Sequence, residues 1–353
     1  MQEGLTNSFD VSNSDQLVRE KQTELERRGI KHCFHAPVTC ATAINEGVVA
    51  GFGDGNIGIF RPGLFPEIKK AHKGTILCIA ADDDDFVLTG GDDGLLLKTS
   101  TDGYIEEIKN FNKKWIDCVA HKKDLIACSS GKNVNVWNSD QKEPEVLVHR
   151  STIGGLSFDK TSKRLAVAHY GGVTVWELIK RKWKSSVFAW KGSHGAVSFS
   201  PNGKYLVTAM QENAVHGWRI RDKTNMAMAG YPSKVKSFAW VGETPFLVTS
   251  GADEAICWPF DGKCGPMERS PVCLGKYNNI MVTQVHSLPR ENAVFAGYRD
   301  GSVLLAEINE NNSGILIRGS TGAQVTALSV SSTGSHIFIG DDDGNILWSP
   351  LWA

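Results

Sequence analysis

Three glycines near the start of the chain have the spacing of a phosphate-binding turn. Gly53, Gly55 and Gly58 in the stretch GDGNIGIF match G-x-G-x-x-G, the pattern that cradles a dinucleotide pyrophosphate. That chemistry needs a helix directly after the turn, so that its N-terminal amides face the phosphate. Here a short apolar run follows and Pro62 stops it, so we expect no helix. The residues therefore indicate a turn between two β-strands.

Other residues that could take part in catalysis or metal binding are few and scattered. The chain lacks the G-x-S-x-G, H-E-x-x-H and P-loop patterns. Glu212 and Asp253, in neighbouring turns, would form a carboxylate pair for acid–base work or a hard cation, although solvated surface charge is the simpler interpretation. Cys40, Cys78 and Cys118 hold equivalent positions and would suit a soft metal, but other copies carry small residues there. We expect no catalytic residues, no cofactor and no bound metal.

The composition is typical of a globular chain with balanced charge. Its 353 residues are 41% hydrophobic and 22% charged, with a formal net charge of −1. A nucleic-acid or membrane-surface binder would carry a basic excess. The N-terminal stretch is polar and lacks the apolar core of a signal peptide, and the eight cysteines include no C-x-x-C pair. We expect a cytoplasmic protein with no nucleic-acid or membrane partner, and favour a monomer.

The sequence repeats itself about every 40 residues. The glycine turn at Gly55 recurs at Gly94, Gly301 and Gly344, and degenerate copies lie between them. Each copy has a first strand rich in Val, Ile and Phe, a short turn, a second strand, an Asp-Gly-like turn and a third strand. Alternating apolar residues bounded by Gly, Asn and Asp are hairpin signals. A period of about 40–45 residues is that of a four-stranded propeller blade.

These repeats resemble those of the WD40 family over roughly residues 31–353. In that family Gly-His precedes the first strand, Asp sits in the second turn and Trp closes the third strand. His72 and Asp93 fill the first two roles in one copy, and Trp137, Trp176 and Trp218 fill the third in others. The segments MQENAVHGW, AGYPSKVKSFAW and TSGADEAICWPF are similar to those of stand-alone bacterial WD40 proteins of unassigned activity. The resemblance implies a β-propeller that binds other proteins.

Eight copies predict an all-β ring of eight four-stranded blades, with seven blades as the alternative. The first strands are expected to begin at Val38, Ile76, Ile116, Ile153, His194, Val235, Val282 and Val325. The sequence stops soon after Trp348, too early for a fourth strand in the last blade, and an unpaired edge there would promote aggregation. We therefore predict that residues 30–35 supply this strand and close the ring.

The residues before the closing strand have helical character. Ser14 or Asp15 would cap a helix, good helix formers follow, and Gly29 would end it. The apolar face of this segment is thin, which favours a surface helix on a blade edge over an oligomer contact. The chain is thus divided into a lead-in with a short helix at residues 1–29 and a single propeller at residues 30–353.

One turn departs from the Asp-Gly pattern and indicates a binding surface. It reads MQEN at residues 210–213, and in the next copy Tyr231 takes the place where WD40 repeats carry His. Aromatic anchors beside isolated charges are typical of interfaces. We predict a partner-binding rim made of Trp190, His194, Glu212, Tyr231, Lys234, Asp253 and Tyr298. The opposing interpretation is that Trp190 and Tyr231 fill gaps between strands while the charges are solvated.

The residues and the resemblance together favour a non-enzymatic scaffold. A rigid ring with variable loops preorganises recognition groups at little entropic cost, so we expect a protein or peptide partner on this rim. Two other functions stay open. One is an accessory role in metal-ion (zinc) homeostasis, to which His194, Glu212 and His216 would contribute. The other is a propeller hydrolase, which would need a deep channel pocket with convergent carboxylates.

Overall fold

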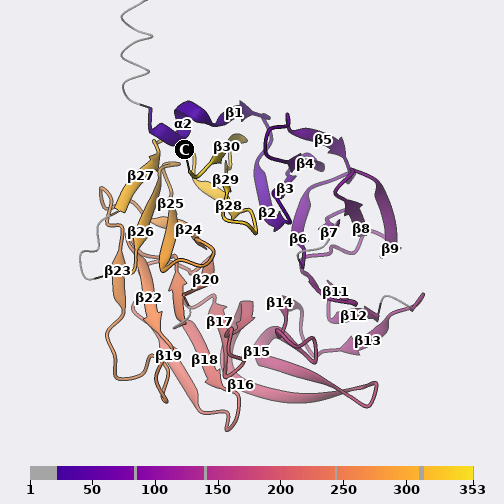
Figure 1. Ribbon diagram of the computed structural model, residues 1–353. Coiled ribbons are helices and arrows are strands. Elements are labelled where there is room, and N and C mark those ends of the chain that lie inside the picture. Colours follow the sequence, from indigo (N-terminus) through magenta and orange to yellow (C-terminus); the bar gives the residue numbers. More distant parts are fainter. Residues whose placement is uncertain (1–21, 83–85, 139–140, 243–244, 310–313, 353) are drawn as a thin grey trace, which may run out of the picture.

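Seven antiparallel sheets form a ring in the computed structural model of the chain (Figure 1). The structure describes residues 22–82, 86–138, 141–242, 245–309 and 314–352. Within each sheet, neighbouring strands are consecutive in the chain, except that β1 pairs with β30. The first strand of each repeat lies nearest the centre of the ring and the fourth lies at the outside (Figure 1). When one continuous sheet is counted as one blade, the protein is an all-β, seven-bladed propeller.

Six of the sheets have four strands each. The first three comprise β2 (Val38–Ile44), β3 (Gly47–Phe52), β4 (Asn56–Phe60) and β5 (Glu67–Lys70); β6 (Ile76–Ala80), β7 (Phe86–Gly91), β8 (Leu95–Ser100) and β9 (Ile105–Asn110); and β10 (Val119–Lys122), β11 (Leu125–Ser130), β12 (Asn133–Asn138) and β13 (Glu145–Val148). The last three comprise β20 (Phe238–Val241), β21 (Phe246–Thr249), β22 (Ala255–Pro259) and β23 (Val272–Leu274); β24 (Val282–Ser287), β25 (Ala293–Tyr298), β26 (Val303–Glu307) and β27 (Gly314–Arg318); and β28 (Val325–Val330), β29 (His336–Asp341), β30 (Asn345–Pro350) and β1 (Ile30–Cys33).

The remaining sheet has six strands and holds two sequence repeats. It comprises β14 (Ile153–Phe158), β15 (Arg164–Ile179), β16 (Lys182–Phe199), β17 (Tyr205–Met210), β18 (Val215–Arg219) and β19 (Asn225–Met228). The range β15 contains two strand segments, between which the chain reverses at Gly171 and Gly172, with φ values of 90° and 135°. The range β16 runs from one repeat into the next. The Leu178 amide donates to the Lys163 carbonyl (2.8 Å), and the Ile220 amide donates to the Lys204 carbonyl (2.9 Å). These equivalent bonds show that the strand pattern of each repeat persists within the larger sheet.

The predicted count of eight separate blades is therefore corrected to the alternative of seven, although all eight sequence repeats are present. The reason is that β16 runs without a break from the outer strand of one repeat into the inner strand of the next. The two inner strands also lie close together, since a β-carbon on Gly154 or Gly155 would collide with the backbone at His194 and Gly195. Elsewhere the predicted first strands are found, and β10 and β20 begin three residues later than predicted.

Glycine turns set the positions of the loops between the second and third strands. Gly55, Gly94, Gly301 and Gly344 have φ values of 84°, 80°, 90° and 86°. This left-handed region is open to glycine because it has no β-carbon. A β-carbon at Gly55 would also collide with the backbone of His72 and Gly74. The stretch GDGNIGIF thus comprises the turn between β3 and β4 and the whole of β4, and the dinucleotide interpretation is wrong.

The ring is closed by β1, which forms the fourth strand of the last sheet. Ile30 lies opposite Trp348 in β30, and Cys33 lies opposite Asn345. The prediction that residues 30–35 close the ring is confirmed for residues 30–33. The inner strands β28 and β2 are in contact at the same junction, where Phe60 packs on Phe338 with ring centroids 4.7 Å apart. Segments from the two ends of the described chain therefore lie side by side (Figure 1).

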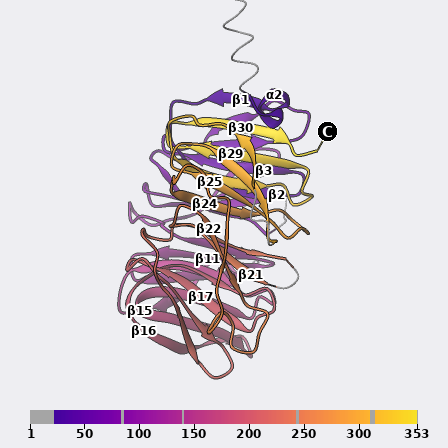
Figure 2. The same cartoon turned by 90° about the vertical axis from the view of Figure 1, so that its left-hand side faces the viewer.

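Helix α2 (Glu24–Arg28) holds β1 in place, and the two lie beside β30 in Figure 2. Thr23 caps the helix through a capping box, and its hydroxyl donates to the Ile317 carbonyl (2.6 Å). Arg28 donates to two carbonyls at the C-terminal end of β30, at 3.1 and 2.6 Å. Leu25 is buried in the apolar cluster of the last sheet. The helix is thus bonded to the blade edge that β1 completes.

The helical prediction is confirmed for residues 24–28, whereas Gln22 and Thr23 are not helical and Thr23 caps the helix in place of the predicted residues. Gly29 follows the last helical residue, as predicted, and the helix packs on a blade edge. The predicted caps Ser14 and Asp15 lie outside the described residues, and the domain division at residue 29 stays a prediction. None of the described helices is long and apolar enough to cross a membrane.

Candidate functional site

The unusual turn at residues 211–214 joins β17 to β18 beside the middle of β16. The indole of Trp190 stacks on the imidazole of His216, with ring centroids 4.0 Å apart and planes 17° apart. His216 meets Trp218 edge-on at 4.7 Å, and His194 donates from Nε2 to the Trp190 carbonyl (3.1 Å). We call Trp190, His194, His216 and Trp218 the rim cluster. Its rings come from two strands and tie the turn to the body of the sheet.

In three other repeats the position of Trp190 holds a polar side chain that joins strands. This position lies four residues before the start of the predicted first strand and is filled by His72, His149 and Tyr231. Trp176 Nε1 donates to His149 Nε2 (3.0 Å), which links the third strand to the loop before the first. Trp190 stands four residues before His194, so ring stacking replaces the polar link in this repeat.

Two imidazole nitrogens of the rim cluster have no hydrogen-bond partner within the described part of the chain. They are Nδ1 of His194 and Nε2 of His216, on side chains that are 2% and 1% exposed. Burial, with a contribution from His194, lowers the pKa of His216 to about 4. Burial also lowers the pKa of His194, against the opposing effects of the Trp190 carbonyl and the Glu212 carboxylate. Both rings are therefore neutral at neutral pH, and each keeps a lone pair.

Exposed groups surround the rim cluster at the surface. Glu212 is exposed, and its carboxylate accepts a hydrogen bond from the Ser193 amide (3.1 Å). Tyr170, midway along β15, lies opposite Ser193 in the sheet, and its side chain is 70% exposed. The structure thus brings the predicted residues Trp190, His194 and Glu212 together and adds Tyr170. Sequence reasoning missed Tyr170, although an aromatic residue in the turn HYGG was the available signal.

Tyr231 joins strands and does not face outward. Its hydroxyl lies 2.7 Å from Thr249 Oγ1 and accepts a hydrogen bond from Trp258 Nε1 (2.6 Å). The side chain is 8% exposed, and burial raises its pKa to about 12. A hollow of about 300 Å³ beside it is lined by Ala229, Gly230, Ala252, Ile256, Trp258 and Pro271. The contacts give Tyr231 the linking role that His149 has in its own repeat.

The other predicted residues lie apart from the rim cluster. The Asp253 carboxylate is 3.6 Å from Lys276 Nζ. Tyr298 is fully buried, its hydroxyl donates to the Gly275 carbonyl, and burial raises its pKa. Lys234 is half-buried. Within the described residues, no hydrogen bond or ion pair joins these three side chains to the rim cluster or to Glu212, so the predicted rim separates into distinct groups.

The groups considered for metal or acid–base chemistry do not converge. Glu212 and Asp253 have separate partners, the Ser193 amide and Lys276. Burial raises the pKa of Cys40 to about 11 and that of Cys118 to about 12, so both thiols are protonated at neutral pH. Over the described ranges, no three His, Cys, Asp or Glu side chains are placed to hold one metal ion.

Comparison with known proteins bears on the family and the fold. The family model described as "WD domain, G-beta repeat" matches residues 313–348. The chain is a β-propeller, and its last repeat matches the model of this family. No curated protein matches it. The crystal structure of the computationally designed Ika8 protein is similar, with a TM-score of 0.72 and 18% identity over 91% of this chain and 98% of that chain. At this identity the likeness shows the propeller fold alone.

Replacing Tyr231 by Phe tests whether its hydroxyl supports the blade. The change removes the shared partner of Thr249 and Trp258, so we expect the free energy of unfolding to fall by about 1–3 kcal/mol. Urea unfolding followed by circular dichroism measures it. Tyr104→Phe, at a ring that is 68% exposed, is the control and should change the value by less than about 0.5 kcal/mol. Equal stability of the two variants would show that the hydroxyl has no linking role.

The buried histidines predict that stability falls in mild acid. The folded-state pKa of His216, about 4, lies below its ordinary value of 6.5, so between these values the unfolded chain binds a proton that the folded chain excludes. The contribution is fully present above about pH 6.5 and is lost as the pH falls toward 4. His216→Phe should therefore lessen the decline in unfolding free energy between about pH 7 and pH 4.5.

Guanidinium unfolding at both pH values gives this decline directly. His32→Phe replaces an exposed histidine and should leave the wild-type decline unchanged. If the His216 variant declines as steeply as wild type, the buried ring is not the source of the pH dependence.

Proposed function

We propose that this propeller is a non-enzymatic scaffold that binds a protein or peptide partner at Tyr170, Glu212 and the rim cluster. The observation that carries the proposal is the Tyr170 ring, which is 70% exposed. Tyr170 pairs across the sheet with Ser193, whose amide donates a hydrogen bond to Glu212. An aromatic anchor beside a charge is the usual energetic centre of a protein interface. Beneath it the Trp190–His216 stack holds the backbone, so binding would order few additional groups.

The acid–base groups of the propeller support binding over catalysis. Asp93 lies 3.0 Å from His72 Nδ1, and Thr89 Oγ1 lies 2.9 Å from His72 Nε2, the order of an acid–base–nucleophile chain. However, His72 and Thr89 are 1% and 0% exposed, so a substrate cannot reach the hydroxyl. The chain of hydrogen bonds joins the strands of its blade.

A metal-ion role is the second possibility, because the unpaired nitrogens of His194 and His216 are potential ligands. Two imidazoles supply half of the four ligands of a structural zinc site. The Glu212 carboxylate, which opposes the lowering of the pKa of His194 by burial, is bonded to the Ser193 amide. A zinc ion would therefore need ligands from water or from a partner, and the protein-binding proposal needs no such addition.

Removing the two exposed rim groups tests the scaffold proposal. Tyr170→Ala together with Glu212→Ala deletes the anchor and the charge and leaves the buried rings intact. Trp190 and Tyr231 are unsuited to this test, because the first stacks on buried His216 and the second is hydrogen-bonded within the blade. In affinity capture from the native cell, we expect the double variant to recover its partner at least about tenfold less well than wild type.

The matched control changes an exposed pair elsewhere, Tyr104→Ala with Glu106→Ala, and should recover the partner as wild type does. Equal recovery by wild type and the Tyr170/Glu212 variant would show that the rim does not bind. Metal content measured on the same wild-type preparation separates the alternative, since one zinc ion per chain would favour the metal-ion role.

A further inference from the structure

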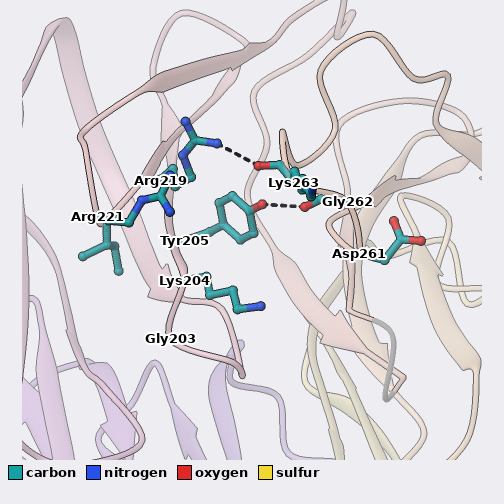
Figure 3. A pocket seen from close by; sticks show the side chains of 9 residues that line it. Gly203, Lys204, Tyr205, Arg219, Arg221, Asp261, Gly262 and Lys263 are labelled. Atoms are coloured by element: carbon teal, nitrogen blue, oxygen red, sulfur yellow. Dashed lines mark hydrogen bonds between the residues drawn. The ribbon is translucent and has the colours of Figure 1, made fainter.

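A second surface lies at the opposite ends of β17 and β18 from the rim. Tyr205 begins β17 and Arg219 ends β18, whereas the turn at residues 211–214 joins the other ends of these strands. The length of β17 separates the two surfaces by about 17 Å. At this second surface a hollow of about 630 Å³ lies between the fifth and sixth repeats (Figure 3). It shares no residue with the rim and does not depend on the function proposed there.

Three separate turns line this hollow, which we call the cationic pocket. They contribute Gly203 and Lys204 before β17, Arg219–Arg221 at the end of β18, and Asp261–Lys263 after β22. Tyr205 is 2% exposed and forms part of the wall, and its hydroxyl donates to the Gly262 carbonyl (2.8 Å). Arg219 donates to the Lys263 carbonyl (2.8 Å), so the walls from the two repeats are bonded to each other (Figure 3).

Positive charge dominates the cationic pocket. Four cations line it, Lys204, Arg219, Arg221 and Lys263, with the single carboxylate Asp261. Asp222 pairs with both arginines, and Arg269 pairs with Asp261. The lining residues alone have an excess of three positive charges. The excess is still three when Asp222 and Arg269 are included, since there are then five cations and two carboxylates. The whole chain has a net charge of −1, so this excess is a local feature.

Three of the cationic groups are available to a ligand. Lys204 and Lys263 are exposed and have no ion-pair partner in the described part of the chain. Arg221 is 82% exposed and reaches Asp222 only at 3.5 Å, while Arg219 holds that carboxylate at 2.8 Å. Figure 3 shows Arg221 to the left of the Tyr205 ring and Lys204 below it. The charges therefore surround an apolar surface and are not gathered at one point.

The spacing of the cations favours an extended chain of carboxylates over a single phosphate group. A phosphate group is bound by donors that converge on one position, commonly with backbone amides at a helix N-terminus. Here the available cations come from three different turns, and the wall between them is the Tyr205 ring and the Ile220 side chain. Carboxylates spaced along an extended chain match cations that are spread in this way.

We propose that the cationic pocket binds an acidic peptide segment of a protein partner. Carboxylates of the segment pair with Lys204, Arg221 and Lys263, and its backbone lies over Tyr205 and Ile220. The hydrogen bonds of Tyr205 and Arg219 join the two walls, so the backbone that carries the cations is held in place. This surface is distinct from the rim, so both can be occupied in one complex.

Binding of a fluorescein-labelled hexaglutamate peptide to the full chain tests this proposal. Fluorescence anisotropy at about 50 mM salt should show saturable binding that weakens as salt is added. Lys204→Glu with Lys263→Glu should weaken it at least about tenfold, because attraction becomes repulsion at two positions. The control, Lys113→Glu with Lys114→Glu, makes the same change in net charge at exposed lysines after β9 and should keep the wild-type affinity.

Each other outcome overturns the proposal. No saturable binding of hexaglutamate to wild type, equal binding of a labelled hexaglutamine peptide, or equal weakening by both double variants would each do so. If inorganic tripolyphosphate binds in a manner that requires Lys204 and Lys263 while hexaglutamate does not, the pocket is a phosphate site. Circular dichroism of both double variants establishes that they are folded, so a loss of binding can be assigned to the pocket.

Discussion

The pairing of β1 with β30 is the contact on which the rest of the propeller depends. A ring of sheets buries its apolar side chains between neighbours, so the last sheet needs a fourth strand from elsewhere in the chain. Without β1, the edge of β30 and the aromatic contacts of Phe60 with Phe338 and Trp348 would be exposed to water. Closure also assigns every turn to one of two faces. The rim and the cationic pocket have defined positions only in the closed ring.

The fifth repeat differs from its neighbours in how its strands are held together. His72 and Tyr231 use their polar atoms to join strands, and few of those atoms are left for recognition. In the fifth repeat Trp190 stacks on His216 instead, and two imidazole nitrogens stay unpaired. A buried unpaired nitrogen lowers stability, and such exceptions are expected at functional sites. The same repeat carries the rim on one face and most of the cationic pocket on the other.

Much of the fold could be predicted because short-range chemistry determines it. Glycine turns such as Gly55 require positive φ, and the missing fourth strand pointed to residues 30–35, of which residues 30–33 form β1. The number of sheets could not be predicted, because it depends on whether the backbone of β16 continues from one repeat to the next. The sequence left open whether Tyr231 binds a partner or fills a gap, and its bond to Thr249 supports the second interpretation. The burial of Tyr298 was not predicted, since its partner Gly275 comes from a distant position. Glu212 was identified because its turn breaks the repeat.

Amide hydrogen exchange of β1, measured by mass spectrometry, tests the closure of the ring most directly. If residues 30–33 form the fourth strand of the last sheet, peptides that cover β1 exchange as slowly as those from β28 and β30. Leu25→Ala, which weakens the packing of α2, then accelerates exchange in β1 and β30 together and leaves β6–β9 unchanged. Rapid exchange of β1 beside a fully protected β30 would contradict the closure and the placement of both binding surfaces.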